Sequence, residues 1–312
     1  MNKEFKKYFS GYLANINEID SKYNYCGKNF HIGFEDTFNS KKNNGTKEVI
    51  IYSKNDRDAS EVSKLIHAGY TLLHANIGFV GNDSPEPVTD EFYNQSQQSS
   101  DEHKNYYIFS TSGLAIASKI ACKVSHKNKF KFALIKYYLA CTLHSNDIVD
   151  IDPMHSEYVH LKNYSVFDNI RIGYAVVVFY SVIEELGLEI RSNNNKQSLI
   201  DGQWNPEVKD DLEKRLLASK INIHEQIFWN FRGTPTKIER RKKPIKKIKT
   251  EWSRYDVRDV YIEISDGIRI LSWIRSKIAS HKLSDDIKSL SVYDVANANF
   301  LCRKILLESL RM

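Results

Sequence analysis

Arg275 and His281 are the two residues of this chain whose types and spacing best suit a chemical reaction. They stand in the stretch IRSKIASHK, residues 274–282, near the end of a long segment with a periodic apolar pattern. A guanidinium can hold a phosphate, and an imidazole can accept or donate a proton near neutral pH. Together they suffice to cut RNA without a metal ion. Because such a pair arises about once by chance in a chain of this composition, the prediction depends on the elements around it.

The segment 254–281 is predicted to be one long helix, because its apolar residues recur at spacings of three and four. Arg275 falls near the middle of the resulting stripe, where we expect a carboxylate, a ligand or a subunit boundary to cover it. His281 lies about 120° further round the helix. The two side chains therefore converge only if the arginine reaches across, or if a second copy of the helix packs against the first. The structural alternative is an arginine that favours the helix macrodipole, followed by a capping histidine.

Two neighbouring elements strengthen the functional interpretation. The apolar segment FYSVIEELGLEIR carries Glu184 and Glu185, and either carboxylate could pair with Arg275. A further amphipathic helix is predicted after the motif, over 292–310. Ser276 follows the arginine directly and can donate one hydrogen bond.

This arrangement, from about residue 130 to 312, resembles the HEPN superfamily. In that family an acid-bearing apolar helix, a variable insert, a helix ending in Arg-x(4–6)-His and a final amphipathic helix form a small bundle. Residues 139–157 are similar to the leader of some longer HEPN-domain proteins. The resemblance implies a homodimer in which Arg275 holds the scissile phosphate and His281 acts as general base or acid. It implies products with a 2′,3′-cyclic phosphate and a 5′-OH, and no cofactor.

Ser276 stands where many catalytic HEPN proteins have asparagine. The alternative to a ribonuclease is therefore a catalytically silent HEPN module that binds RNA or a protein partner. The insert between the acid-bearing helix and the motif, about 191–253, is also long for the family.

A basic tract, RRKKPIKKIK, carries seven positive charges and no acid over residues 240–249. It could grip a phosphate backbone, or it could be a solvated loop that keeps the protein soluble. The aromatic residues Trp229, Phe231 and Trp252 flank it and could stack bases or belong to the core. We expect RNA contacts from Arg240, Arg241, Lys242, Lys243, Lys246, Lys247 and Lys249.

A second class of chemistry is suggested by a cluster of metal-ligand types between residues 144 and 155. These residues could serve a metal-dependent hydrolase, or they could line a polar loop turned by Pro153. Their spacing matches no known metal motif, so we expect no metal site and keep the hydrolase as a third reading. The cluster comprises His144, Asp147, Asp150, Asp152 and His155.

Composition and pattern predict a mainly α protein with two regions. The strand candidates 30–38 and 47–53 and a helix over 56–75 indicate a small α/β region within 1–105, with a polar linker at 81–105. Residues 106–312 are predicted to be helical and HEPN-like. The expected helices there cover 112–126, 130–145, 166–191, 205–219, 254–281 and 292–310.

Charge and cysteine usage suggest the compartment and the partners. The net charge of +6 permits a polyanionic partner. The four cysteines show no paired spacing and indicate reduced thiols in the cytoplasm. The N-terminus lacks the apolar pattern of a signal peptide. The apolar run within 166–191 indicates a buried helix rather than a membrane span. We therefore expect a cytoplasmic, metal-independent endoribonuclease. It would act as a toxin or antiviral-defence effector, with a possible antitoxin or sensor partner.

Overall fold

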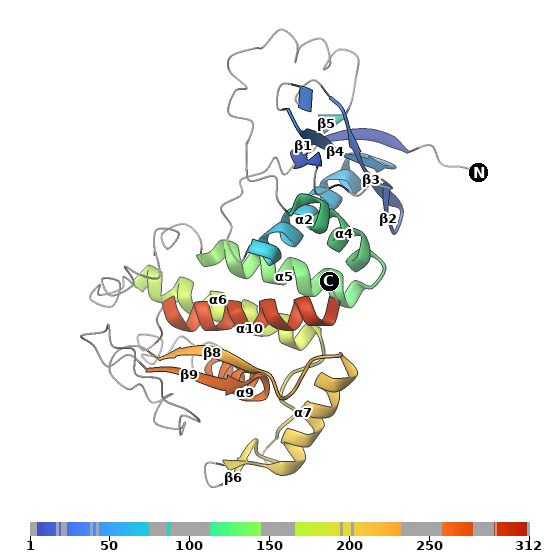
Figure 1. The fold of residues 1–312 in the computed structure, drawn as a ribbon. Helices are drawn as coiled ribbons and strands as arrows, with labels where there is room; N and C mark the ends of the chain where they lie inside the picture. The colour runs from blue at the N-terminus through green and yellow to red at the C-terminus, as the bar shows by residue number, and fades with distance from the viewer. Residues whose placement is uncertain are drawn as a thin grey trace. The chain divides into compact units, whose positions relative to one another are not determined.

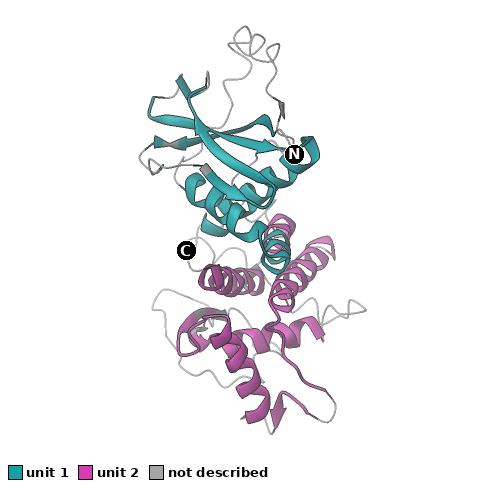
Figure 2. Ribbon diagram, turned by 90° about the vertical axis from the view of Figure 1, so that its right-hand side faces the viewer, with its two compact units in different colours: residues 1–135 teal, residues 136–312 magenta. Residues whose placement is uncertain are grey.

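The fold was analysed in a computed structural model of the chain. It describes residues 5–16, 19, 24–37, 40–41, 44–74, 86–87, 113–144, 166–193, 196–200, 203–231, 258–276, 290 and 292–310. The protein is mostly helical with an N-terminal antiparallel sheet (Figure 1), which confirms the predicted mainly α class. Two compact units, residues 1–135 and 136–312, are distinguished by colour in Figure 2.

Unit 1 is built on the five-stranded sheet, in the order β2-β3-β4-β1-β5, with antiparallel neighbours. The predicted strands are present as β3 (Phe30–Glu35) and β4 (Thr46–Ser53). Three further strands were not predicted from the sequence: β1 (Lys6–Asn15), β2 (Asn24–Gly27) and β5 (Glu86–Pro87). The register of β1 against β4 shifts between Phe9 and Leu13, where Gly11 has a φ of 75°, a backbone conformation that favours glycine.

Two helices of unit 1 pack on each other and on the sheet. The first is α2 (Asp56–His74), and the second is α4 (Leu114–Ser125). They approach closely at Gly69, where a Cβ atom would lie 3.0 Å from the Ala117 carbonyl oxygen. Helix α4 therefore belongs to the same unit as the sheet. The compact unit ends at Ile135, further along the chain than the linker proposed at 81–105, of which the structure describes only 86–87.

Unit 2 is organised around the apolar helix α6 (Val166–Glu185), which packs against α10 (Val292–Leu310) and α9 (Ile264–Ile274). Within the described chain, α6 is the one helix long and apolar enough to cross a membrane by length and composition. Its residues Ile172, Val176, Phe179 and Ile183 are buried. The helix therefore forms part of the core of this unit, as predicted from its length.

The boundary between the units falls inside α5 (Asn128–His144), which was predicted at 130–145. Helix α7 (Pro206–Ala218) is capped by the Asn205 side chain, which accepts a hydrogen bond from the Glu207 backbone N–H at 3.1 Å. A short ribbon, β6 (Leu199–Ile200) with β7 (Gln203–Trp204), precedes α7.

The prediction of one helix over 254–281 was wrong in its first part. Residues Arg258–Glu263 form strand β9, which pairs antiparallel with β8 (Gln226–Phe231), and α9 begins only at Ile264. The run Val260, Tyr261 and Ile262 is β-branched and aromatic, and such residues favour strands when a partner strand is available. Residues 254–257 and 277–281 lie outside the described residues.

Candidate functional site

Arg275 lies directly after the last residue of α9 and is paired with a carboxylate of α6. Its Nη2 is 3.2 Å from Oε1 of Glu184, so the predicted pairing with one of the two glutamates is confirmed. The pair is partly open to solvent, because the Arg275 side chain is 44% exposed and that of Glu184 is 36% exposed. The apolar stripe ends with the helix at Ile274, and the guanidinium beyond it reaches solvent.

Tyr180 completes the immediate surroundings of the arginine. It lies one turn before Glu184 on α6, so both side chains stand on one face of that helix. The Arg275 guanidinium carbon is 6.0 Å from the centre of the Tyr180 ring, within the range of a cation–π contact. Burial raises the pKa of Tyr180, and hydrogen bonds with the Ser272 side chain and the Ile190 backbone N–H oppose that shift in part. The phenol is therefore neutral near pH 7, and its ring lies against the arginine.

Tyr180 was not predicted from the sequence to be a site residue. Its position four residues before Glu184 was the available signal, because that spacing places it beside any partner of the glutamate.

Glu185 is separated from this cluster, although it is adjacent in sequence to Glu184. Its Oε2 accepts a hydrogen bond from Nζ of Lys136 on α5 at 2.6 Å. Successive residues of a helix point about 100° apart, so only one of two neighbouring glutamates can face α9. The structure therefore brings Glu184, and not Glu185, to Arg275.

Ser276 is exposed and turned back on its own helix. Its hydroxyl donates to the Trp273 carbonyl oxygen at 3.1 Å, a common back-bond of serine near the end of a helix. In this conformation the hydroxyl proton is directed to the chain itself and not toward a ligand beside Arg275.

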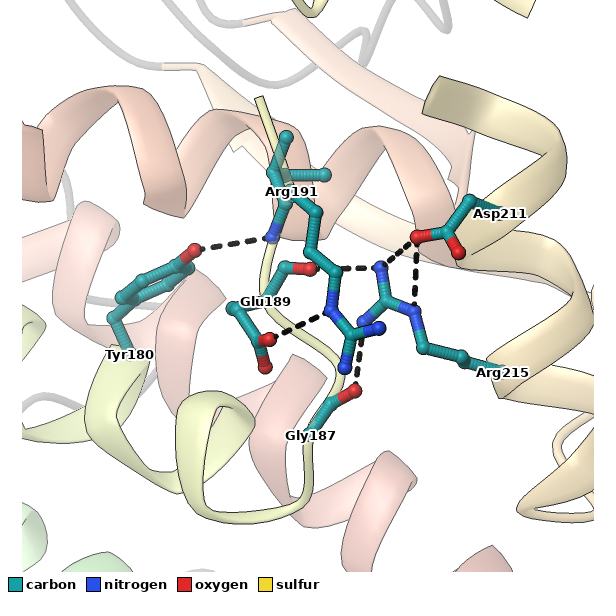
Figure 3. Close-up of polar contacts among 7 residues, drawn as sticks. Tyr180, Gly187, Glu189, Arg191, Asp211 and Arg215 are labelled. Atoms are coloured by element: carbon teal, nitrogen blue, oxygen red, sulfur yellow. Dashed lines mark hydrogen bonds and ion pairs between the residues drawn. The ribbon is translucent and has the colours of Figure 1, made fainter. Parts of the chain in front are cut away.

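The segment after α6 is held by a second arginine, shown in Figure 3. Arg215 of α7 donates to the carbonyl oxygens of Gly187 and Glu189 at 2.6 and 2.9 Å. Its Nη2 and Nε also contact Oδ2 of Asp211, at 2.7 and 3.1 Å. The next peptide N–H, that of Ile190, donates to the Tyr180 hydroxyl at 3.4 Å (Figure 3). Arg215 therefore fixes the segment that contacts Tyr180, and Tyr180 in turn lies beneath Arg275.

Several predicted site residues lie outside the described residues. These are His281, all seven charged residues of the 240–249 tract, and Asp147, Asp150, Asp152 and His155; of His144 the backbone alone is described. Within the described chain, no group of three or more His, Cys, Asp or Glu side chains could hold a metal ion. Trp229 is 1% exposed, so this aromatic belongs to the core and is not free to stack a base.

Chemically, the described cluster is a solvent-accessible guanidinium oriented by one carboxylate and one aromatic ring. Such a group can hold a phosphate without moving a proton itself. Comparisons with known protein families, with curated proteins and with solved structures found no match to this chain.

Proposed function

We propose that this chain is a metal-independent endoribonuclease of the HEPN type, acting in the cytoplasm as a homodimeric toxin or antiviral-defence effector. The observation that supports the proposal is the position of Arg275: it follows the last residue of a helix, is open to solvent, and is paired with the acid of the neighbouring apolar helix. His281 follows it by six residues in the sequence. The order of acid-bearing helix, arginine and final amphipathic helix is the one that the resemblance requires.

In the proposed mechanism Arg275 holds the scissile phosphate and offsets the charge that develops on it. His281 removes the proton from the ribose 2′-OH, or protonates the leaving 5′-oxygen as general acid. The 2′-oxygen attacks phosphorus and the P–O5′ bond breaks. The products are a 2′,3′-cyclic phosphate and a 5′-OH end, and DNA, which lacks the 2′-OH, is not cut.

The test is RNA cleavage in EDTA by the wild type, Arg275→Ala and His281→Ala. Each variant should lose at least ~10²-fold in rate, as expected for a lost acid–base group or anion-binding donor. Wild-type cleavage that begins only on adding Mg²⁺ would move the reaction to the 144–155 cluster. Equal rates in all three proteins would end the Arg–His hypothesis. Light scattering that reports a fully active monomer would contradict the homodimer.

The basic tract is proposed to supply affinity rather than chemistry. The test variant changes four lysines to glutamine, at 242, 243, 246 and 247. If all four contact phosphates, the salt dependence of single-stranded RNA binding should flatten by roughly three log–log units, at about 0.7 per contact. KM should rise while kcat stays nearly unchanged. An unaltered salt slope would reduce the tract to a solubilising loop.

The second candidate is a silent HEPN module that binds RNA or a protein partner. The back-bond from Ser276 to Trp273 favours it, because the residue after the arginine then offers no donor to a substrate. Binding of RNA by the wild type with no cyclic-phosphate product, under conditions where Ser276→Asn does produce it, would select this candidate over the nuclease.

A further inference from the structure

The part of the chain from Gly113 to His144, which includes α4 and α5, is unusual in its charge. It contains six lysines and no aspartate or glutamate. Helix α4 has no acid in its first turn, and neither has α5. Five exposed lysines of unit 1 stand on α4, around the start of α5 and in the turn between β2 and β3. We call them the basic corner: Lys28, Lys119, Lys123, Lys127 and Lys129.

The fold brings these charges to α4 and to the residues around its C-terminal end. Lys119 and Lys123 are four residues apart on α4, so they stand on the same face with a rise of ~6 Å between them. Lys127 and Lys129 follow at the turn into α5. The backbone N–H of Lys28 donates to the Ser125 hydroxyl at 2.8 Å, which attaches the β2–β3 turn to the end of α4.

Two of the five corner lysines are not neutralised by nearby carboxylates of the described chain. Of the nearby acids, Glu61 on α2 is paired with Lys131 at 2.7 Å. Asp58 lines the same hollow as Glu61 and Lys28. Lys119 and Lys129 have no carboxylate partner in the described chain. Like charges four residues apart on a helix destabilise it, and lysines at the start of a helix oppose its macrodipole. The chain therefore carries an electrostatic cost here that an anionic partner would remove.

We propose that the basic corner binds the phosphate backbone of single-stranded RNA. This rests on the proposed function only in naming RNA as the polyanion, and it adds a contact surface on a different unit from Arg275. Phe132, one turn after Lys129 and 51% exposed, supplies a ring on which a base can stack. The exposed face of α4 offers a single large apolar residue, Ile116, which is too little for the apolar side of a membrane-surface helix.

The test replaces all five corner lysines by glutamine in the full-length protein. The probe is a single-stranded 2′-O-methyl RNA, which has no 2′-OH and so cannot be cut by the proposed reaction. If about four lysines meet phosphates, the salt dependence of binding should flatten by roughly three log–log units. We expect the plots of log binding constant against log salt concentration for the wild type and the variant to meet near 1 M salt. The difference in slope then corresponds to about 10²- to 10³-fold weaker binding by the variant near 0.1 M salt. Circular dichroism should show an unchanged fold, because glutamine and lysine have similar helix propensities.

The matched control replaces five exposed lysines that are not part of the corner and carry the same total charge: Lys6, Lys41, Lys64, Lys214 and Lys220. It should leave the salt slope within about one unit of wild type. Equal effects of both variants would mean that only net charge matters, and would overturn the proposal. So would a corner variant that binds RNA normally but no longer binds anionic lipid vesicles.

The outcomes also separate the two proposals. The wild type could prove to cut no RNA, while the corner variant still binds 2′-O-methyl RNA more weakly than the wild type. That result would reject the proposed nuclease and keep the proposed binding surface. If the wild type cuts RNA and the corner variant binds 2′-O-methyl RNA normally, the binding surface is rejected and the nuclease is kept.

Discussion

Replacing Glu184 by glutamine tests whether its ion pair with Arg275 is a resting contact that substrate must displace. The two side chains are 36% and 44% exposed at a separation of 3.2 Å. Exposed pairs of this kind contribute ~0.2–1 kcal/mol, because water and salt screen the attraction. A phosphate that takes Arg275 from Glu184 must overcome that amount.

The expected effect follows directly from this energy. Glu184→Gln should lower KM for RNA, and the Kd of 2′-O-methyl RNA, by about 1.4- to 5-fold, which is ~0.2–1 kcal/mol expressed as an equilibrium ratio. The kcat should be unchanged, because the carboxylate has already left the guanidinium when the bond breaks. The free energy of unfolding should fall by less than ~1 kcal/mol, and the Tm by no more than ~4 °C.

Glu185→Gln is the matched control, since it removes the adjacent carboxylate and the same charge. That carboxylate contacts Lys136 and not Arg275, so the variant should leave KM and Kd unchanged beyond a small effect of net charge. The assays are initial rates on a fluorogenic RNA in EDTA and binding titrations at one fixed salt concentration. A fall in kcat of ~10²-fold or more in Glu184→Gln would refute the reasoning, because it would make the glutamate part of the reaction. Equal changes in KM in both variants would refute it as well.

Three further results are expected. Arg215→Ala should reduce the free energy of unfolding in urea by ~2–3 kcal/mol, because charged hydrogen bonds to two backbone carbonyls are lost. Arg191 is exposed and pairs with the Glu189 side chain at 3.0 Å, so Arg191→Ala should reduce the free energy of unfolding by less than ~1 kcal/mol. Equal losses in the two variants would contradict this. Ellman's reagent should modify one thiol rapidly at pH 8, that of the exposed Cys26. The other cysteines are buried, and burial raises the pKa of Cys122 and Cys141 to about 12. Rapid reaction of a second thiol would contradict this packing. Burial also lowers the pKa of His31 below its ordinary 6.5. The folded state therefore resists protonation, and stability should be lost as the pH falls below about 6.5, an effect that His31→Gln should diminish in urea unfolding.

The helices could be predicted from the sequence because apolar periodicity is a local signal. Helices α2, α4, α5, α7 and α10 lie within two residues of the predicted ranges, whereas α6 ends earlier, at Glu185. Strand β1 was not predicted, because its pattern is interrupted by the bulge at Gly11 and its partner β4 is far along the chain. The error at 258–263 has the same origin. The segment becomes a strand through pairing with Gln226–Phe231, and no local pattern reports a distant partner.

The candidate site could be predicted in part for a related reason. An arginine beside an apolar helix needs a counter-charge, and the acids of α6 were the evident source. The choice between Glu184 and Glu185 depends on the rotation of α6 about its axis, which packing against α9 and α10 determines. The exposure of Arg275 depends on where α9 ends, and helix ends are among the features least fixed by periodicity.

The contacts around Arg275 also connect its geometry to the stability of the segment after α6. Arg215 holds the carbonyls of Gly187 and Glu189, Ile190 then donates to Tyr180, and the Arg275 guanidinium lies over the Tyr180 ring. If this chain of contacts positions Arg275, replacing Arg215 should lower the stability of the fold and, as a separate effect, weaken RNA binding by Arg275. Arg215→Lys keeps the charge but not the forked donor. At a temperature where the variant is fully folded, it should still weaken 2′-O-methyl RNA binding, whereas Arg191→Ala should not. Normal RNA binding by a destabilised Arg215→Lys protein would show that Arg215 supports only the fold and does not position Arg275.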